Sequence, residues 1–252
     1  MNQELRIKNF KFIFGTIIFL FLFLTSTAKA LTIYPAIFEF NTSQNQPLAD
    51  QTQIFNESDG NLTFTADIEN FIPQGELGEQ TYLPGNYGLA SWISLSEKEI
   101  TLAPKEKKYV SFKINLPPNA APGSYGAGIL WHEISDGRGG INVVNRVGAI
   151  VLLTVPGELK TQAELTEYSV PQGLFETADV PFTVRIRNRG NVIIKPIGEI
   201  VIKNIFGKTT DALDINAFGN ALMPESTRKF TLDWAPENLT IFGPYRAELN
   251  IK

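Results

Sequence analysis

The sequence holds few side chains that could act as a nucleophile, a base or a metal ligand. It contains no cysteine and a single histidine, His132, within Trp131-His132-Glu133. One histidine could carry a proton or bind a ligand, but we favour the interpretation of a partly buried histidine near the end of a hairpin. A nucleophile needs a base beside it, and no second histidine is present for a metal site. We therefore expect no enzyme activity, no cofactor and no metal.

Carboxylates are plentiful but do not form a pattern typical of catalysis. Paired acids can hydrolyse glycosides, whereas here Asp and Glu occur mainly in turns and on the polar faces of predicted strands, where they are solvated. Asp59-Gly60 is a turn signal. The residues before it do not match a calcium loop, because Phe55 stands where the first ligand would be.

Aromatic side chains are the remaining candidates for recognition. The segment Ile72–Ser91 is predicted as a long loop carrying Tyr82 and Tyr87, and long loops in compact domains tend to be functional. We interpret this loop first as a structural wrap over a sheet edge; the alternative is contact with a partner or glycan. A carbohydrate-binding module would need exposed rings in a row, for which Trp92, Trp131 and Tyr125 are candidates. Each of these rings could equally belong to the core.

Apolar and polar residues alternate along much of the chain, which is the period of a strand with one buried face. Gly, Pro, Asn and Asp turns separate these runs, a pattern typical of sandwiches and barrels. The sequence therefore predicts an all-β protein. The clearest alternating runs are 62–69, 110–116, 182–187, 230–234 and 245–251.

The chain divides into a leader and two domains. Residues 1–30 combine Arg6, Lys8 and Lys11 with the apolar run Phe12–Leu24 and a small-x-small site ending at Ala30, which predicts a cleaved signal peptide. The run is shorter than the roughly 20 residues of a membrane-spanning helix. Together with the lack of cysteine, this signal predicts an exported bacterial protein, acting at the cell surface, in the periplasm or outside the cell.

Two tandem immunoglobulin-like β-sandwiches are expected after the leader, over 31–157 and 158–252, with the boundary at Pro156-Gly157. We predict six strands in the second domain, near 160–169, 180–188, 193–204, 209–215, 226–234 and 243–251. A seven-strand sandwich needs one more. A strand encoded beyond Lys252, a partner strand that completes the sheet, or a miscount by one would each explain the difference; we expect the first.

The stretch Trp92–Gly128, with Ile100-Thr101-Leu102-Ala103-Pro104 and Pro122-Gly123-Ser124-Tyr125-Gly126, resembles the N-terminal domain of bacterial WxL-interacting cell-surface proteins. That resemblance implies a peptidoglycan-binding-like domain, a second immunoglobulin-like domain and a membrane anchor, which this chain lacks. A second likeness is to periplasmic pilus chaperones, whose cationic cleft grips a subunit's carboxylate. Arg146 and Lys160 fall near the interdomain region, but the sequence does not single them out for this role.

The favoured function is therefore a non-catalytic module of the cell envelope that binds peptidoglycan, another cell-wall glycan or a surface protein. Contact would come from loops and edge strands, including strand addition to an open edge. A carbohydrate-binding module and a periplasmic-chaperone-like protein are the alternatives. The formal net charge of −4 argues against nucleic acid, which needs a basic surface, and membrane contact is expected only through an anchor outside this chain. The candidate contact residues are Tyr82, Tyr87, Trp92 and Trp131.

Overall fold

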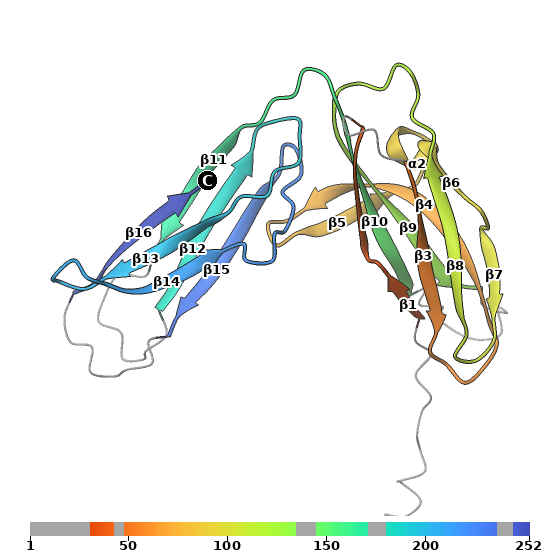
Figure 1. Cartoon of the computed structure of the whole chain (residues 1–252), viewed down its shortest axis with the longest axis horizontal. Coiled ribbons are helices and arrows are strands. Elements are labelled where there is room, and N and C mark those ends of the chain that lie inside the picture. Colours follow the sequence, from red (N-terminus) through yellow and green to blue (C-terminus); the bar gives the residue numbers. More distant parts are fainter. Residues whose placement is uncertain (1–30, 43–47, 135–144, 171–179, 236–243) are drawn as a thin grey trace, which may run out of the picture.

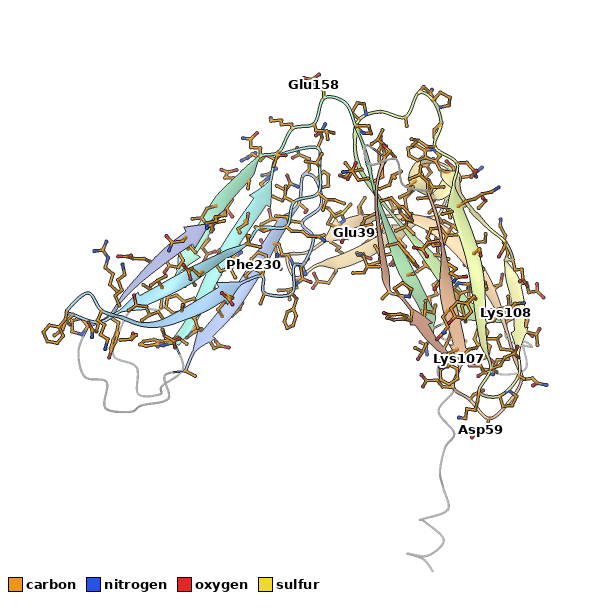
Figure 2. All side chains as sticks on the ribbon, in the orientation of Figure 1. Glu39, Asp59, Lys107, Lys108, Glu158 and Phe230 are labelled. Atoms are coloured by element: carbon orange, nitrogen blue, oxygen red, sulfur yellow. The ribbon has the colours of Figure 1, made fainter. Side chains whose placement is uncertain are left out.

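A computed structural model describes residues 31–42, 48–134, 145–170, 180–235 and 244–252. The predicted leader and the predicted glycine-rich hairpin Asp136–Gly140 lie outside these residues. The described chain forms two β-sandwiches, which lean toward one another as an inverted V joined at its apex by the segment around Glu158 (Figures 1 and 2). The predicted all-β fold with two immunoglobulin-like sandwiches is confirmed. No helix in the described ranges is long and apolar enough to span a bilayer.

Two sheets build the first sandwich, which we call domain 1. One sheet has the order β1-β3-β8-β6 and is called sheet A; the other, sheet B, has the order β2-β10-β9-β4-β5, with β7 pairing with the first part of β4. The strands are β1 (Leu31–Tyr34), β2 (Ile37–Asn41), β3 (Ala49–Asn56), β4 (Leu62–Gln74), β5 (Glu79–Leu83), β6 (Ile93–Leu95), β7 (Glu99–Leu102), β8 (Lys107–Ile114), β9 (Gly123–Glu133) and β10 (Arg146–Val155). A short helix, α2 (Gly88–Trp92), precedes β6.

Alternation along these strands fills the space between the two sheets. In β8 the alternate residues Val110, Phe112 and Ile114 are buried, while Tyr109, Ser111 and Lys113 are exposed. The Phe112 ring meets the edges of Phe38 and Phe40 from β2, at centroid separations of 4.9 and 6.0 Å. Removing such side chains from water is the main stabilising contribution, at about 25 cal/mol per Å².

The N-terminal segment belongs to both sheets of domain 1. β1 pairs antiparallel with β3 in sheet A, and after a cis peptide bond at Tyr34–Pro35 the chain continues as β2 in sheet B. There β2 pairs with β10 in parallel, with Ile37 opposite Ile150 and Asn41 opposite Thr154. One continuous segment therefore connects the two layers.

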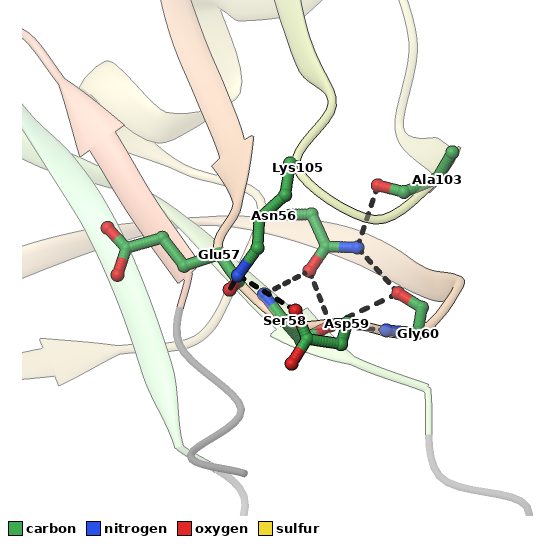
Figure 3. A network of polar contacts seen from close by, with 7 residues as sticks. All are labelled: Asn56, Glu57, Ser58, Asp59, Gly60, Ala103 and Lys105. Atoms are coloured by element: carbon green, nitrogen blue, oxygen red, sulfur yellow. Dashed lines mark hydrogen bonds and ion pairs between the residues drawn. The ribbon is translucent and has the colours of Figure 1, made fainter.

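The predicted turn after β3 is held by the buried side chain of Asn56 (Figure 3). Its Nδ2 donates to the carbonyl oxygens of Gly60 and Ala103, at 2.8 and 3.0 Å, and its Oδ1 accepts from the backbone N–H of Ser58 at 3.0 Å. Lys105 reaches across to Asp59, at 3.0 Å. This turn is thereby fixed to the turn between β7 and β8, so Asp59-Gly60 has a structural role.

The second sandwich, domain 2, has two three-stranded sheets, β11-β12-β15 and β14-β13-β16. Its strands are β11 (Ala163–Ser169), β12 (Val180–Asn188), β13 (Gly198–Lys203), β14 (Thr209–Ile215), β15 (Thr227–Trp234) and β16 (Arg246–Ile251). Each of the six predicted segments contains one of these strands. A separate hydrophobic cluster, including Phe182, Ile186 and Ile200, fills this sandwich. The cluster of domain 1 ends with Val155, so the predicted boundary at Pro156-Gly157 falls between the two clusters.

The segment Ile72–Ser91 is not the long loop that we predicted. β4 continues to Gln74, a tight turn follows, and β5 returns beside it, with Phe71 opposite Tyr82 and Gln74 opposite Glu79. α2 occupies the end of the segment. The tip of this β4–β5 hairpin reaches domain 2, where the backbone N–H of Lys229 donates to the Glu76 carbonyl at 2.7 Å. The segment is thus a structural arm between the domains.

Candidate functional site

The outer face of sheet B, which points away from the core of domain 1, is built around three glycines. Alternation along β9 and β10 places Gly126, Gly128 and Gly148 on this face. A Cβ at Gly126 would lie 2.4 Å from the Phe71 ring, and one at Gly128 would lie 2.5 Å from the Tyr82 ring. Because Gly126 and Gly128 have no side chains, the two aromatic rings lie directly against the backbone of β9. Close approach of this kind is a recurrent role of glycine in strands.

The two rings also contact each other. Phe71 and Tyr82 meet edge to face at a centroid separation of 6.0 Å, an arrangement that contributes beyond simple burial. Phe71 is buried and Tyr82 is half-buried. Together with Ile150 and Leu152 from β10 and Ile37 from β2, they give sheet B a second apolar face opposite its core face. Ile37 keeps 54% of its surface exposed.

Domain 2 faces this apolar surface and leaves a cleft between the domains. The cleft has a volume of about 230 Å³ and is lined on the domain 1 side by Ile37, Phe71, Ile150 and Leu152. The opposite wall is the segment 218–228 of domain 2, which contributes Phe218, Leu222 and Met223. Phe218 is 94% exposed, so a large ring stands unburied at the cleft. Exposed apolar surface of this kind marks sites of interaction.

Ion pairs and backbone hydrogen bonds hold the two walls in place. Lys195 Nζ lies 2.6 and 2.8 Å from the two carboxylate oxygens of Glu39, which Figure 2 shows on the side of domain 1 that faces domain 2. Arg185 Nε lies 2.7 Å from Glu76 Oε2 in the hairpin arm. Near the apex, the backbone N–H of Ser124 donates to the Asn191 carbonyl at 2.9 Å. Glu39 and Glu76 are therefore paired with cations of domain 2, whereas Arg228, which lines the cleft, donates to the carbonyl oxygens of Ala221 and Leu77.

A polar cluster occupies the other end of the same outer face. Arg146 donates to both oxygens of the buried Glu69, at 3.0 and 2.7 Å, and to Asp67 at 2.8 Å. Hydrogen bonding to Glu69 raises the pKa of Arg146 above its ordinary value, while burial and the nearby Glu69 raise the pKa of Tyr82. Such bidentate bonds fix the geometry of both partners. Arg146 is engaged by two carboxylates and is not a free anion-binding cation.

His132 lies beside this cluster. Its Nδ1 is 3.4 Å from Asp67 Oδ2 and makes no hydrogen bond within the described part of the chain. Within the same residues, no group of three His, Asp or Glu side chains is arranged to hold a metal ion. The outer face thus offers apolar contact area and satisfied ion pairs, which suit binding better than bond-making chemistry.

The structure places the four predicted contact residues in different surroundings. Trp131 is fully buried in the core of domain 1, so the prediction that it contacts a partner or glycan is wrong. Its side chain lies on the inner face of β9. Trp92 is half-buried and its ring packs on Tyr125 at 5.1 Å. Tyr87 is 51% exposed, immediately before α2. Only Tyr82 lies on the outer face of sheet B, so the four do not form a row.

The residues that shape the cleft were missed by the sequence reasoning, although one signal was present. In β10 the run Ile150-Val151-Leu152-Leu153 is apolar on both faces of the strand. In the structure Val151 and Leu153 point into the core, whereas Ile150 and Leu152 line the cleft. A strand that is apolar on both faces is covered on both sides. Lys160, the other cation near the boundary, is exposed, and its backbone N–H donates to Asn191.

Comparison of the sequence with protein-family models and with characterised proteins finds no match, so the resemblance to WxL-interacting proteins stays a prediction. Among solved structures, the class 5 fimbriae chaperone CfaA is similar with a TM-score of 0.45 and 11% identity, covering 88% of this chain and 100% of that chain. A chain of a CFA/I chaperone–tip adhesin complex has a TM-score of 0.45 and 11% sequence identity, and the match covers 87% of this chain and 98% of that chain.

A third solved structure, from the CsuC–CsuE chaperone–tip adhesion subunit complex of Acinetobacter baumannii, gives a TM-score of 0.44 and 12% identity, covering 88% of this chain and 97% of that chain. At these scores and identities the likenesses do not identify what this chain binds. The evidence for function is the cleft itself.

Proposed function

We propose that the protein is a non-catalytic, chaperone-like binding protein of the cell envelope, which holds an apolar segment of another exported protein in its interdomain cleft. The observation that carries this proposal is the second apolar face of sheet B, opposed across the cleft by the exposed ring of Phe218. Of the two alternatives expected from the sequence, this is the periplasmic-chaperone-like one. The predicted leader supports a location outside the cytoplasm.

The composition of the cleft favours a polypeptide over a glycan. Glycan recognition would use exposed aromatic rings, but Trp131 is buried and Trp92 is covered by Tyr125. The apolar part of the cleft lining consists of aliphatic and phenylalanine side chains, and polar residues such as Gln74, Asn220 and Arg228 form its margin. An extended chain can place apolar side chains between such walls while its backbone contacts the polar margin.

Phe218 provides a direct test, because domain 2 offers a matched control. Phe206 is a second exposed phenylalanine, 85% accessible, in the turn between β13 and β14 and outside the cleft lining. We expect the intact protein to bind an unfolded probe, reduced and carboxymethylated α-lactalbumin, measured by fluorescence anisotropy. Phe218→Asp should weaken binding by about tenfold, equivalent to about 1.4 kcal/mol, whereas Phe206→Asp should leave it unchanged.

Ile37→Asp, on the opposite wall, should weaken binding in the same way. Circular dichroism and thermal unfolding of each variant would establish that the fold is retained. Equal binding by Phe218→Asp and Phe206→Asp, or no binding of the probe by the intact protein, would contradict the proposed function.

A further inference from the structure

The turn between β13 and β14 carries two large apolar side chains that are not buried. Phe206 keeps 85% of its surface exposed and Ile205 keeps 59%. They are the central residues of a turn in which the Gly207 N–H donates to the Asn204 carbonyl at 2.9 Å. Gly, Pro, Asn, Asp and Ser dominate in turns, and neither apolar side chain belongs to the core cluster of domain 2. Folding of the chain therefore does not account for them.

Hydrogen bonds fix the shape of this turn. The N–H of Asn204 donates to the Lys208 carbonyl at 3.0 Å. The side-chain Oδ1 of Asn204 accepts from the N–H groups of Phe206 and Lys208, at 3.0 and 3.1 Å. Gly207 has a φ of 75°, the left-handed conformation that closes hairpin loops of this type. The outward position of Ile205 and Phe206 is thus built into the backbone.

Cations surround the base of the turn. Lys208 ends the turn, is exposed and has no ion-pair partner within the described ranges. Lys203 and Arg246 lie opposite each other on β13 and β16. They share one carboxylate, that of Glu248, at 2.5 and 3.3 Å. Even when Asp211, the next acid along β14, is counted, these cations outnumber the acids, so the base of the turn carries an excess of positive charge.

The turn lies at the far end of domain 2. Figure 1 shows it at the end of the sandwich away from the apex, where domain 1 is joined. The residues of the turn are also separate from those that line the interdomain cleft. The feature is therefore a convex apolar tip with a cationic base, independent of the cleft in which we place the partner segment.

We propose that the β13–β14 turn is a membrane-contact site, which places Ile205 and Phe206 in the interface of an anionic lipid bilayer. Interfacial binding combines burial of apolar side chains at the boundary of the acyl chains with attraction between cations and acidic headgroups. The tip supplies the first contribution, and Lys203, Lys208 and Arg246 supply the second. Export by the predicted leader would bring the folded protein close to a bilayer surface.

Shape and charge favour a lipid surface over a pocket in another protein. A protein pocket could accept one phenylalanine ring, but it gives no reason for the excess of cations behind the ring. The chain as a whole has a formal net charge of −4, so an anionic bilayer repels most of the protein and attracts this end of domain 2. The protein should therefore approach the bilayer with this turn first.

Co-sedimentation with lipid vesicles tests the site. We expect the exported protein to bind vesicles of equal parts phosphatidylglycerol and phosphatidylcholine, less so at high salt, and to bind pure phosphatidylcholine vesicles much more weakly. Phe206→Ser should weaken binding to the mixed vesicles by about tenfold. Phe218→Ser is the matched control, because it removes a similarly exposed ring from the cleft, and it should bind as the intact protein does.

The cationic base is tested in the same assay. Lys208→Gln removes one cation next to the tip and should weaken binding to the mixed vesicles by about fivefold. Lys160→Gln is the control, since it removes the same charge from an exposed residue near the domain boundary, and it should have little effect. Circular dichroism establishes that each variant is folded.

A label beside the turn shows which part of the protein meets the lipid. Because the chain contains no cysteine, Thr209→Cys can be labelled specifically with nitrobenzoxadiazole. Emission of this label should shift to the blue on mixed vesicles and be quenched by brominated lipid. The same label at Ser111→Cys, at an exposed position of β8 in domain 1, should not respond.

Absence of vesicle binding would overturn the proposal. So would equally strong binding to pure phosphatidylcholine, because the cations would then play no part. Equal binding by Phe206→Ser and Phe218→Ser, or by Lys208→Gln and Lys160→Gln, would contradict it as well. A label at position 209 that does not respond while the protein binds vesicles would place the contact elsewhere and would also overturn it.

Discussion

At the scale of single residues, the outer face of sheet B depends on two glycines whose missing side chains leave room for aromatic rings. Gly126 and Gly128 have no Cβ, and Phe71 and Tyr82 occupy the space where a Cβ would be. On the same face the buried Glu69 carboxylate accepts two hydrogen bonds from Arg146. Tyr82 interacts electrostatically with both Glu69 and Arg146, so the aromatic and charged groups of this face are coupled through Tyr82.

Gly126→Ala tests the fit between glycine and ring. The new methyl group would meet the Phe71 ring at 2.4 Å, and overpacking of this kind costs about 1–3 kcal/mol of unfolding free energy. Gly60→Ala is the matched control, since nothing lies within 4 Å of its Cβ position, and its effect should stay within about 0.5 kcal/mol. Urea unfolding measures both. If Gly126→Ala is as stable as the control, the ring does not occupy that space.

Adding Phe71→Ala to Gly126→Ala should remove the clash between the new methyl group and the ring. The changes in unfolding free energy of the two substitutions should then not be additive. Because the two residues touch, the double variant is expected to be destabilised by less than the sum of the single variants. Strict additivity would show that the two positions act independently.

At the scale of elements, alternation was enough to find most strands but not to tell which face is inside. Alternation places Ile129 and Trp131 on one face of β9, yet a period of two does not distinguish the inner face from the outer one. Trp131 could be placed in the core only once Ile54, Phe112 and Leu153 were seen around the same interior. Information of this kind comes from the partner sheet and is absent from the local sequence.

The β4–β5 hairpin was missed for a related reason. Its turn, Gly75-Glu76-Leu77-Gly78, reads as a polar loop with glycines, and β5 is short and only partly buried. β5 is held by pairing with β4 and by the contact of Tyr82 with Gly128, which lies far away in the sequence. Tertiary context thus determined a strand that intrinsic preference did not predict.

The ion pair between Lys203 of β13 and Glu248 of β16 can be followed through the pKa of Glu248. Lys203 of β13 contacts Glu248 at 2.5 Å, and hydrogen bonding to Lys203 holds the pKa of Glu248 below its ordinary value. A carboxyl whose pKa is lower in the folded than in the unfolded state adds stability above its unfolded pKa. That stability is lost as the pH falls through the folded value. The contribution of this exposed pair is therefore confined to pH values above the acidic range.

Lys203→Met should raise the pKa of Glu248 toward the ordinary value of a glutamate, as measured by NMR titration of the side-chain carboxyl. Lys208→Met is the control, because it removes the same charge from the nearby turn between β13 and β14 without a contact to Glu248. An unchanged pKa in Lys203→Met, or the same rise in Lys208→Met, would show that Lys203 does not hold this carboxylate.

At the scale of the whole molecule, the separation of the two domains is set by a few polar contacts around the cleft. Glu39–Lys195 and Glu76–Arg185 connect the domains from two different elements of domain 1. Exposed ion pairs contribute only about 0–1 kcal/mol each, and small polar interfaces within a chain permit relative domain motion. We therefore expect these contacts to let the cleft adjust its width to an occupant.

Charge reversal at one of these contacts tests the arrangement. Glu39→Lys would place a like charge opposite Lys195, and Lys195→Glu would place a like charge opposite Glu39. Because like charges repel, each single variant should have a larger radius of gyration in small-angle X-ray scattering. The double variant, Glu39→Lys with Lys195→Glu, restores opposite charges and should recover the original dimensions. Identical scattering from all four proteins would show that this pair does not set the domain separation.

The continuous segment that contributes β1 to one sheet and β2 to the other also has a mechanical consequence. β2 and β10 run parallel and pair at positions from Ile37–Ile150 to Asn41–Thr154. Tension applied at the two ends of domain 1 pulls these strands in opposite directions along their length, so the load falls on all their rungs together in shear. An antiparallel arrangement loaded from one end would instead open one rung after another.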